Sequence, residues 1–350
     1  MADKEVYYSD YLQLDKILDA QQLESTKAGV RADDEMLFII IHQAYELWFK
    51  QILFEVDIVG NIFAQQGIND NSPDLQISVH RLKRVATILK VLIHQIDILE
   101  TMTPLDFLDF RNLLRPASGF QSIQFKILEA RLGLKYEQRH GQQYYVSQLR
   151  PEDVEKVKNA EGKKPLSDMV NTWLERMPFF DNKKFWEGYK SISKENKSPY
   201  IFWNDYRWQY DHSLLEAEKG NMAHFDTLFL NEKDYPANRQ FSQKANRSAL
   251  FIMLYRDYPM LQQPFQLLST LLDIDESLNL WRYRHMNMVH RMIGTRIGTG
   301  GSSGKDYLTA TISKHSVFKE IAELTSYLID RHHLPKLSSE LENVLGYSRT

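Results

Sequence analysis

The chain has 350 residues, of which 43% are hydrophobic and 25% charged, and a formal net charge of −3, values typical of a globular protein with length for one large or two ordinary domains. It has no cysteine, which excludes disulfides, thiolate metal ligands and cysteine nucleophiles. Because we find no basic patch for nucleic acid, no signal peptide and no apolar run near the ~18 residues of a membrane span, we expect a cytoplasmic protein with neither nucleic-acid nor membrane partners.

Helical spacing dominates the first part of the chain. Apolar residues at intervals of three and four predict long helices over about 33–66 and 74–102. Asp33 or Asp34 can cap the first of these helices. The helix that follows the second long one is expected to end near Pro116.

Two helix ends have clear signals. Thr103 as N-cap, Pro104 at the first helical position and Asp106 in the first turn predict the start of a helix. Gly133 is the expected C-cap residue of a helix that begins at about Phe120.

The rest of the chain alternates between helical and irregular stretches. Residues 134–165 predict a polar connection with one short helix, and residues 219–240 look irregular. The glycine-rich stretch 294–304 fails the phosphate-loop pattern, with Thr299 and Asp306 at two required positions, so it predicts a surface linker or a mobile lid. We find no strand pair and no repeat. Further helices are expected over about 166–176, 182–195, 199–218, 242–256, 261–293 and 317–332.

Two histidines lie on apolar helix faces. His42 shares a face with Phe38, four residues earlier. His285 lies within an apolar stripe of helix 261–293. Each can be a core histidine that satisfies a backbone carbonyl, or a pocket residue that holds a ligand or a metal such as haem iron. His290 is the rival to His285, but its helix face is less apolar.

An arginine in an apolar helix is a further candidate. Phe107, Arg111, Leu114 and Ser118 follow one another at spacings of 4, 3 and 4, so they project toward one side. Arg111 can reach the surface or pair with a carboxylate such as Asp109. Alternatively, its guanidinium faces a pocket and binds a substrate carboxylate.

Several blocks together resemble one known family. They are residues 38–50 (FIIIHQAYELWFK), 99–104 (LETMTP), 110–111 (FR), 116–122 (PASGFQS), 281–286 (WRYRHM) and 298–304 (GTGGSSG). In this order they resemble the tryptophan 2,3-dioxygenases. The resemblance covers roughly residues 7–135 and 240–335, and the stretch between matches only in pattern. One departure is Asp33, where the family commonly has His.

The resemblance implies the fold and the activity. The expected fold is an all-α bundle that encloses b-type haem, formed by 1–350 as a single domain with a divergent helical insertion at about 135–240. The expected assembly is a homotetramer. The expected reaction is oxidative cleavage of the indole C2–C3 bond of L-tryptophan by O2 to N-formylkynurenine, the first step of the kynurenine pathway, with one ferrous haem per subunit.

The resemblance also implies roles for individual residues. His285 would be the proximal iron ligand, and Ser118 would lie near the haem on the distal side. His42 would be the distal histidine near the indole N–H, a catalytic residue that orients the ring. Arg111 would pair with the tryptophan carboxylate, and Thr299 would contact the amino-acid end of the substrate.

The resemblance places the remaining residues in the substrate pocket, either of their own subunit or of a neighbouring one. The N-terminal segment, residues 1–20, would place Tyr8 and Tyr11 in the pocket of a neighbouring subunit. The indole pocket would be walled by Phe38, Phe107 and Leu114.

Two other functions stay open at the level of sequence. One is haem-dependent mono-oxygenation of a tryptophan-like substrate, which ¹⁸O2 labelling distinguishes by one labelled atom instead of two. The other is a non-enzymatic helical sensor or scaffold, which would bind no haem.

Overall fold

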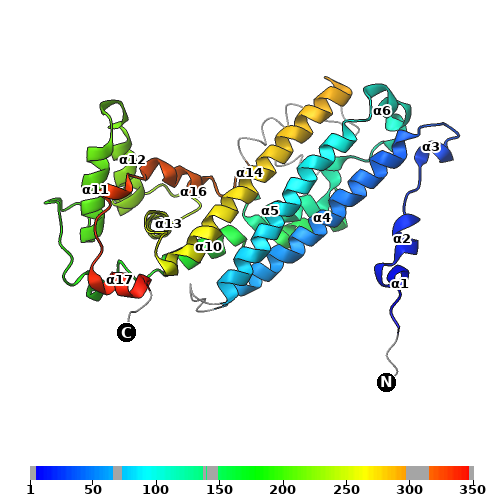
Figure 1. Ribbon diagram of the computed structural model, residues 1–350. Helices are drawn as coiled ribbons and strands as arrows, with labels where there is room; N and C mark the ends of the chain where they lie inside the picture. Colours follow the sequence, from blue (N-terminus) through cyan, green and yellow to red (C-terminus); the bar gives the residue numbers. More distant parts are fainter. Residues whose placement is uncertain (1–4, 66–72, 137–138, 140–148, 297–314, 347–350) are drawn as a thin grey trace.

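A computed structural model describes residues 5–65, 73–136, 139, 149–296 and 315–346. These residues form helices and loops, with no β-strand among them. Figure 1 shows an elongated body with a bundle of long helices toward one end and a smaller helical lobe at the other. The all-α fold expected from the sequence is confirmed. Within this described part of the chain, no helix has the length and apolarity needed to cross a membrane.

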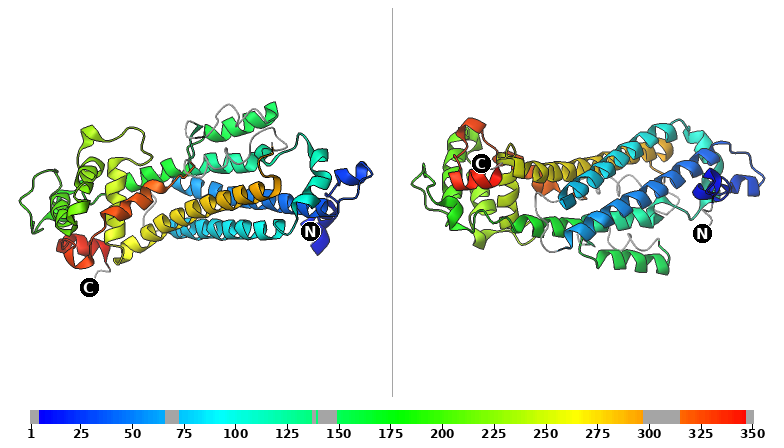
Figure 2. Two further views of the ribbon diagram at one scale, coloured as in Figure 1. Left: turned by 90° about the horizontal axis from the view of Figure 1, so that it is seen from above. Right: turned by 60° about the horizontal axis from the view of Figure 1, so that its bottom comes forward.

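Three long helices form the frame of the bundle. They are α4 (Asp34–Phe63), α5 (Pro73–Leu99) and α14 (Pro259–Ile293). Helix α5 packs against both α4 and α14, and the shorter α7 (Ile123–Leu132) packs against α4 (Figure 2). The inward face of α5 explains this arrangement, because its buried apolar residues recur every three or four positions. They are Leu75, Val79, Leu82, Val85, Leu89, Leu92 and Ile96.

The helix that follows α5 begins at the predicted signal. In α6 (Pro104–Arg111) the Thr103 hydroxyl accepts the backbone N–H of Asp106 at 3.3 Å. The Asp106 carboxylate accepts the Thr103 N–H at 2.9 Å, which completes a capping box. After Arg111 the chain tightens into a 3₁₀ turn over Asn112–Leu114, so the helix ends earlier than expected.

The end of α7 requires glycine. Gly133 is the C-cap residue, as predicted, and has φ +137°. A Cβ atom at this position would lie 2.1 Å from Ser167 Oγ and 2.7 Å from Ser167 Cβ. A side chain is therefore excluded both by the backbone conformation and by the close approach of Ser167 on α10 (Leu166–Glu175).

The N-terminal helices α1 (Tyr8–Leu12), α2 (Leu14–Leu18) and α3 (Glu24–Lys27) extend from one end of the bundle (Figure 1). They are tied to α4 by Glu35, whose buried carboxylate accepts the backbone N–H groups of Glu24 at 2.8 Å and Ser25 at 2.9 Å.

The predicted capping of α4 by the side chain of Asp33 is wrong. Asp33 occupies the N-cap position but has helical backbone angles and makes no capping hydrogen bond. Its carboxylate accepts instead from the guanidinium of Arg31 at 2.7 Å.

The smaller lobe has a core of aromatic rings. Its principal helices are α10 (Leu166–Glu175), α11 (Ile201–Ser213), α12 (Asn221–Phe229) and α13 (Gln243–Leu254). The lobe also contains α16 (Lys319–Glu323), α17 (Ser339–Leu345) and short 3₁₀ turns, whereas α9 (Pro151–Glu161) packs against α7 of the bundle. The buried rings of this lobe include Phe180, Phe202, Trp203, Tyr206, Phe225, Phe229 and Phe251.

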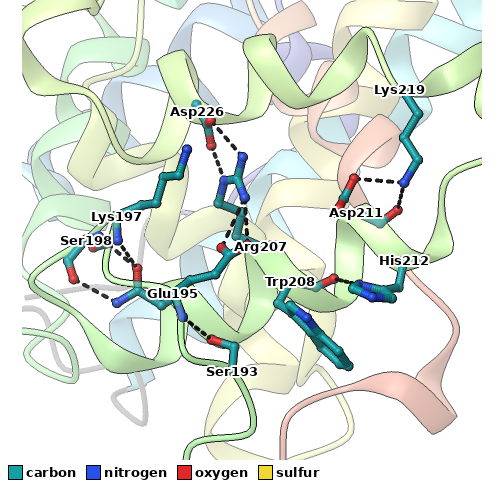
Figure 3. Close-up of polar contacts among 11 residues, drawn as sticks. Ser193, Glu195, Lys197, Ser198, Arg207, Trp208, Asp211, His212, Lys219 and Asp226 are labelled. Carbon is teal, nitrogen blue, oxygen red and sulfur yellow. Dashed lines mark hydrogen bonds and ion pairs between the residues drawn. The ribbon is translucent and has the colours of Figure 1, made fainter.

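Ion pairs fasten the outer helices of this lobe (Figure 3). The Arg207 guanidinium on α11 donates to Asp226 on α12 at 2.6 Å and to Glu195 in the preceding loop at 2.9 Å. Lys219 donates to the Asp211 carboxylate at 2.8 Å across the α11–α12 connection. These contacts fix the connection between α11 and α12.

Three of the predicted elements in this part of the chain are wrong. The expected helix at 182–195 is reduced to a 3₁₀ turn over Lys183–Trp186. The loop after it wraps around the buried carboxylate of Asp205, which accepts the backbone N–H groups of Ile192 at 3.1 Å and Ser193 at 3.0 Å. These amide groups therefore donate to a side chain instead of to the carbonyl groups of a helix. The stretch expected to be irregular, 219–240, contains α12.

The third error concerns the expected helix at 317–332. Helix α16 ends at Glu323 and a 3₁₀ turn follows over Leu324–Tyr327. The carbonyl of Tyr327 accepts the hydroxyl of Tyr206 at 2.6 Å, and the carbonyl of Ser326 accepts the hydroxyl of Tyr210 at 3.0 Å. Buried tyrosines of α11 therefore satisfy the carbonyls where the expected helix would continue.

Candidate functional site

The bundle encloses a cavity of about 280 Å³. Its walls come from α4, α6, α7 and α14 together with the 3₁₀ turn Gly119–Gln121. Most of the lining is apolar or aromatic, which suits a flat organic ligand. Among the sequence-predicted site residues, Phe38, His42, Phe107, Arg111, Ser118 and His285 line the cavity.

His285 enters the cavity from α14. Its ring lies parallel to that of Trp281, with centroids 5.2 Å apart and an interplanar angle of 3°. Burial, with a smaller effect of His42, lowers the pKa of His285 to about 4, so the imidazole is neutral at neutral pH. It forms no hydrogen bond with any residue that the structure describes. A neutral imidazole in these surroundings has the properties of a metal ligand. His290, the rival, is exposed.

His42 faces the cavity from α4. Its Nδ1 lies 2.7 Å from the carbonyl oxygen of Phe38, which can only accept a hydrogen bond. Burial lowers the pKa of His42, so the ring is neutral and its single proton is held on Nδ1. The other nitrogen, Nε2, is then an acceptor. The Phe38 ring packs on the imidazole at a centroid distance of 4.1 Å and fixes its orientation.

Arg111 adds a cation to the same cavity. It is the last residue of α6 and only 5% exposed, so it does not reach the surface. Burial, followed by repulsion from Arg115 and Arg296, lowers the pKa of Arg111. Phe107, one turn earlier on α6, packs against Phe38 with centroids 5.7 Å apart. An aromatic slot and a buried guanidinium therefore share one cavity.

Comparison with known proteins decides the family. The sequence model of the tryptophan 2,3-dioxygenases matches residues 1–328. A protein of Bdellovibrio bacteriovorus named tryptophan 2,3-dioxygenase is 42% identical over 98% of both chains. Proteins with the same name from Dictyostelium discoideum and Xenopus tropicalis are 43% and 41% identical, over 99% and 97% of this chain and 90% and 86% of their own lengths. The chain belongs to the tryptophan 2,3-dioxygenase family.

Three residues that the resemblance to tryptophan 2,3-dioxygenases assigns to a pocket do not line the cavity of this chain, and a fourth lies outside the described residues. Leu114 is half-buried and packs against the core, but it does not line the cavity. Tyr8 and Tyr11 lie on α1 and are each 75% exposed. Thr299 lies outside the described residues. The single chain thus brings together the residues predicted to bind haem and those predicted to bind the indole. The two tyrosines do not contribute to the cavity of their own chain.

A charged cluster at the cavity wall was missed by sequence reasoning. The buried carboxylate of Glu129 accepts from Arg139 at 2.7 Å and from Arg282 at 2.8 Å, and it lies 3.3 Å from His315 Nδ1. Lys126, one turn before Glu129 on α7, also lines the cavity. These contacts join residues far apart in the sequence. The only available signal was local: Lys126 and Glu129 share one face of α7 with the N-cap residue Ser122.

The described residues contain no group of three or more histidine or acidic side chains that could hold a metal ion. Among these residues, a candidate metal ligand in the cavity is therefore a single imidazole such as His285.

Proposed function

We propose that the protein is a haem-dependent tryptophan 2,3-dioxygenase. It cleaves the indole C2–C3 bond of L-tryptophan with O2 to give N-formylkynurenine, the first step of the kynurenine pathway. The observation that carries the proposal is the aromatic cavity in which His42, Arg111 and His285 meet, each within a sequence block of the family.

The residues of the cavity fit b-type haem. The chain has no cysteine for thiolate ligation, and His285 offers a neutral imidazole that the described residues leave unbonded. Trp281 supports the imidazole from one side, and Met288 and Met292 of the same helix add apolar walls. His285 would hold the haem iron, and Ser118, which lines the same cavity, would lie close to the haem. When bound, ferrous haem supplies the activation of O2 that the protein side chains alone cannot provide.

His42 orients the indole. Because its Nδ1 proton is donated to the Phe38 carbonyl, Nε2 is left to accept the indole N–H. The lowered pKa of His42 keeps this nitrogen unprotonated at neutral pH. We therefore assign His42 a catalytic role in holding the ring, which does not need a strong base because indole is electron-rich.

Arg111 fixes the amino-acid end of the substrate. Its guanidinium, buried in the wall, pairs with the tryptophan carboxylate, and charge-assisted bonds of this kind are among the strongest in proteins. Phe38 and Phe107 wall the indole, with Leu114 behind the cavity wall. Thr299 contacts the amino-acid end. Fixing both ends of the substrate brings C2 and C3 of the indole into a reactive position.

The active assembly is a homotetramer. The exposed Tyr8 and Tyr11 on α1 reach the pocket of a neighbouring subunit, which accounts for their distance from their own cavity. The cytoplasmic location expected from the sequence is part of this proposal.

Absorbance spectroscopy and product analysis test the proposal in one experiment. Protein reconstituted with haem is reduced without air, its Soret band is recorded, and L-tryptophan is added with ¹⁸O2. We expect a Soret band and N-formylkynurenine that contains two labelled oxygen atoms. A single labelled atom would indicate mono-oxygenation, and a protein without a Soret band would exclude the haem assignment.

A further inference from the structure

Arg282 lies about one turn before His285 on α14. Because the two residues are three positions apart, their side chains project from the same side of the helix, and both line the cavity. Only 4% of Arg282 is exposed. Its guanidinium donates to the carboxylate of Glu129 on α7 at 2.8 Å, to the side chain of Asn279 at 3.0 Å and to the carbonyl of His315 at 3.4 Å. The contact with Glu129 therefore joins the turn of α14 that carries His285 to a second wall of the cavity.

Glu129 is a fixed anchor for this contact. Its carboxylate is buried, and its second oxygen accepts from Arg139 at 2.7 Å. His315 Nδ1 lies 3.3 Å from the oxygen that Arg282 contacts. Burial alone would raise the pKa of Glu129, but the three groups that contact its carboxylate hold the pKa well below the usual value. The carboxylate is thus charged at neutral pH and held from several sides.

The ion pair connects two helices that pack mainly on other neighbours. Helix α7 packs most closely on α9 and α4, whereas α14 packs most closely on α5. Between α7 and α14 lie the Glu129–Arg282 pair and, next to it, the rings of Phe125 and Trp281, with centroids 5.0 Å apart. The Arg282 guanidinium also lies 5.9 Å from the centroid of the Phe125 ring. These four side chains link the two walls of the cavity within about one turn of His285.

The two kinds of contact in this link constrain the helices differently. Ring contacts of this apolar kind are largely non-directional, so they tolerate a small sliding or rotation of α14. An arginine–carboxylate pair has a defined geometry, and breaking it in a buried setting leaves a charge without its partner. Metal ligation in turn requires the ligand atom to be placed within about 0.2 Å, and residues behind a metal ligand commonly set its orientation. The ion pair is therefore suited to hold the helix that presents the imidazole.

We propose that Glu129 and Arg282 are positioning residues for the haem ligand, whose ion pair fixes α14 at the turn that carries His285 and so sets where the imidazole meets the iron. This inference rests on the proposed function. The role does not need either side chain to touch the haem or the substrate. Because the backbone of α14 carries the imidazole, loss of the pair should alter the bond between His285 and the iron.

Resonance Raman spectroscopy of the ferrous haem protein measures this bond directly. We expect Arg282→Met to shift or broaden the iron–histidine stretching band. The rate of haem transfer to a haem-scavenging globin should rise about tenfold, as is usual when a partner that orients a metal ligand is removed. Arg282→Lys, which keeps a cation beside Glu129, should restore most of both properties. An unchanged band in Arg282→Met would overturn the proposal.

The matched control is Arg207→Met. It removes an ion pair of similar construction from the smaller lobe, where Arg207 donates to Asp226 at 2.6 Å and to Glu195 at 2.9 Å. Denaturant unfolding of the haem-free protein should show a lower free energy of unfolding, whereas the iron–histidine band should match that of wild type. A band that shifts equally in Arg207→Met and Arg282→Met would show that it follows overall stability, which would also overturn the proposal.

A ligand detached from α14 provides a second test. In His285→Gly, imidazole added to the solution takes the place of the side chain without being held by the helix. Adding Arg282→Met to His285→Gly should therefore change the iron–imidazole band much less than Arg282→Met changes the wild-type band. Equal changes in the two backgrounds would mean that the pair does not act by placing His285.

Far-ultraviolet circular dichroism establishes that each variant is folded. If Arg282→Met does not fold, Glu129→Gln, which keeps the size of the side chain but not its charge, takes its place, and an unchanged band in that variant overturns the proposal. A wild-type band that neither substitution alters removes the positioning role and leaves the proposed function intact. A wild-type protein that binds no haem would overturn the proposed function together with this inference.

Discussion

At the scale of single residues, the two cavity histidines differ in what holds them. His42 donates its Nδ1 proton to the Phe38 carbonyl, whereas His285 stacks on Trp281 and forms no hydrogen bond with the described residues. The same residue type is thus prepared for two tasks: His42 has a fixed tautomer for hydrogen bonding, and His285 keeps a ring nitrogen for coordination.

Replacing His285 by alanine tests this division. We expect His285→Ala to lose stable haem binding, because no second imidazole on α14 faces the cavity. The Soret absorbance after gel filtration measures the loss. His290→Ala is the matched control on the same helix and should keep the wild-type spectrum. A variant His285→Ala with unchanged iron ligation would assign the iron to another residue.

Arg111 permits a test of substrate binding. Arg111→Leu removes the buried guanidinium, so KM for L-tryptophan should rise about 100-fold, as expected for loss of a charge-assisted pair. The Soret band should stay the same. Arg115→Leu removes a nearby exposed arginine and should leave KM within about twofold. Similar KM values for Arg111→Leu and wild type would rule out the carboxylate contact.

At the scale of elements, α6 is the shortest of the helices that line the cavity and depends most on its cap. The capping box at Thr103 and Asp106 fixes the start of the eight-residue helix that carries Phe107 and Arg111. Isolated helices of this length are not stable in water, so the cap and the packing of Phe110 must hold it in place.

Removal of the cap should be measurable in stability and in binding. Thr103→Ala should lower the free energy of unfolding by about 1 kcal/mol and raise KM for tryptophan, because Arg111 is carried by the frayed helix. Denaturant unfolding and steady-state kinetics measure the two effects. Thr87→Ala, on the exposed face of α5, should be neutral because alanine favours the helix interior. Equal losses in both variants would contradict the capping role.

Sequence patterns were sufficient for the elements whose determinants are local. The long helices α4, α5 and α14 lie within a few residues of their predicted bounds, because each buries a regular apolar face. Thr103 and Gly133 mark helix ends by their own chemistry. The loop around Asp205 and the early end of α16 were not predictable, because their backbone groups bond to side chains distant in the sequence.

The candidate site divides in the same way. His42, His285 and Arg111 were found because each lies in an apolar helical face or a family block. The Glu129 cluster was missed because its partners, Arg139, Arg282 and His315, come from separate segments. A charged residue on one helix face does not indicate whether it meets water or a distant partner.

At the scale of the whole molecule, α14 connects the two ends of the structure. It begins beside the smaller lobe and carries His285 in the bundle (Figure 1). Helices α13, α16 and α17 of the lobe pack on it. We propose on this basis that residues 1–350 act as a single domain, with the insertion at about 135–240 built onto the same framework.

The N-terminal tyrosines are the feature that a single chain leaves unexplained. Tyr8 and Tyr11 are each 75% exposed, on a helix that extends away from the bundle. We consider the case in which these tyrosines complete the pocket of a neighbouring subunit. A chain that lacks them then keeps its own haem site, but the pocket of the neighbour that it should complete is defective. Two different defects can then compensate each other in one assembly.

Hybrid assemblies test this directly. One chain carries His285→Ala, and the other carries Tyr8→Ala with Tyr11→Ala; the two are co-expressed with different tags and purified in sequence. Each parent alone should form little N-formylkynurenine. In a reciprocal pair the intact haem pocket receives tyrosines from its partner, so the hybrid should recover roughly half the wild-type rate per pair. As a control, a parent chain that carries Tyr7→Ala in place of the two tyrosine substitutions should remain active. Tyr7 is an exposed neighbour of Tyr8 and Tyr11. A hybrid no more active than the sum of its separately purified parents would show that each chain completes its own pocket.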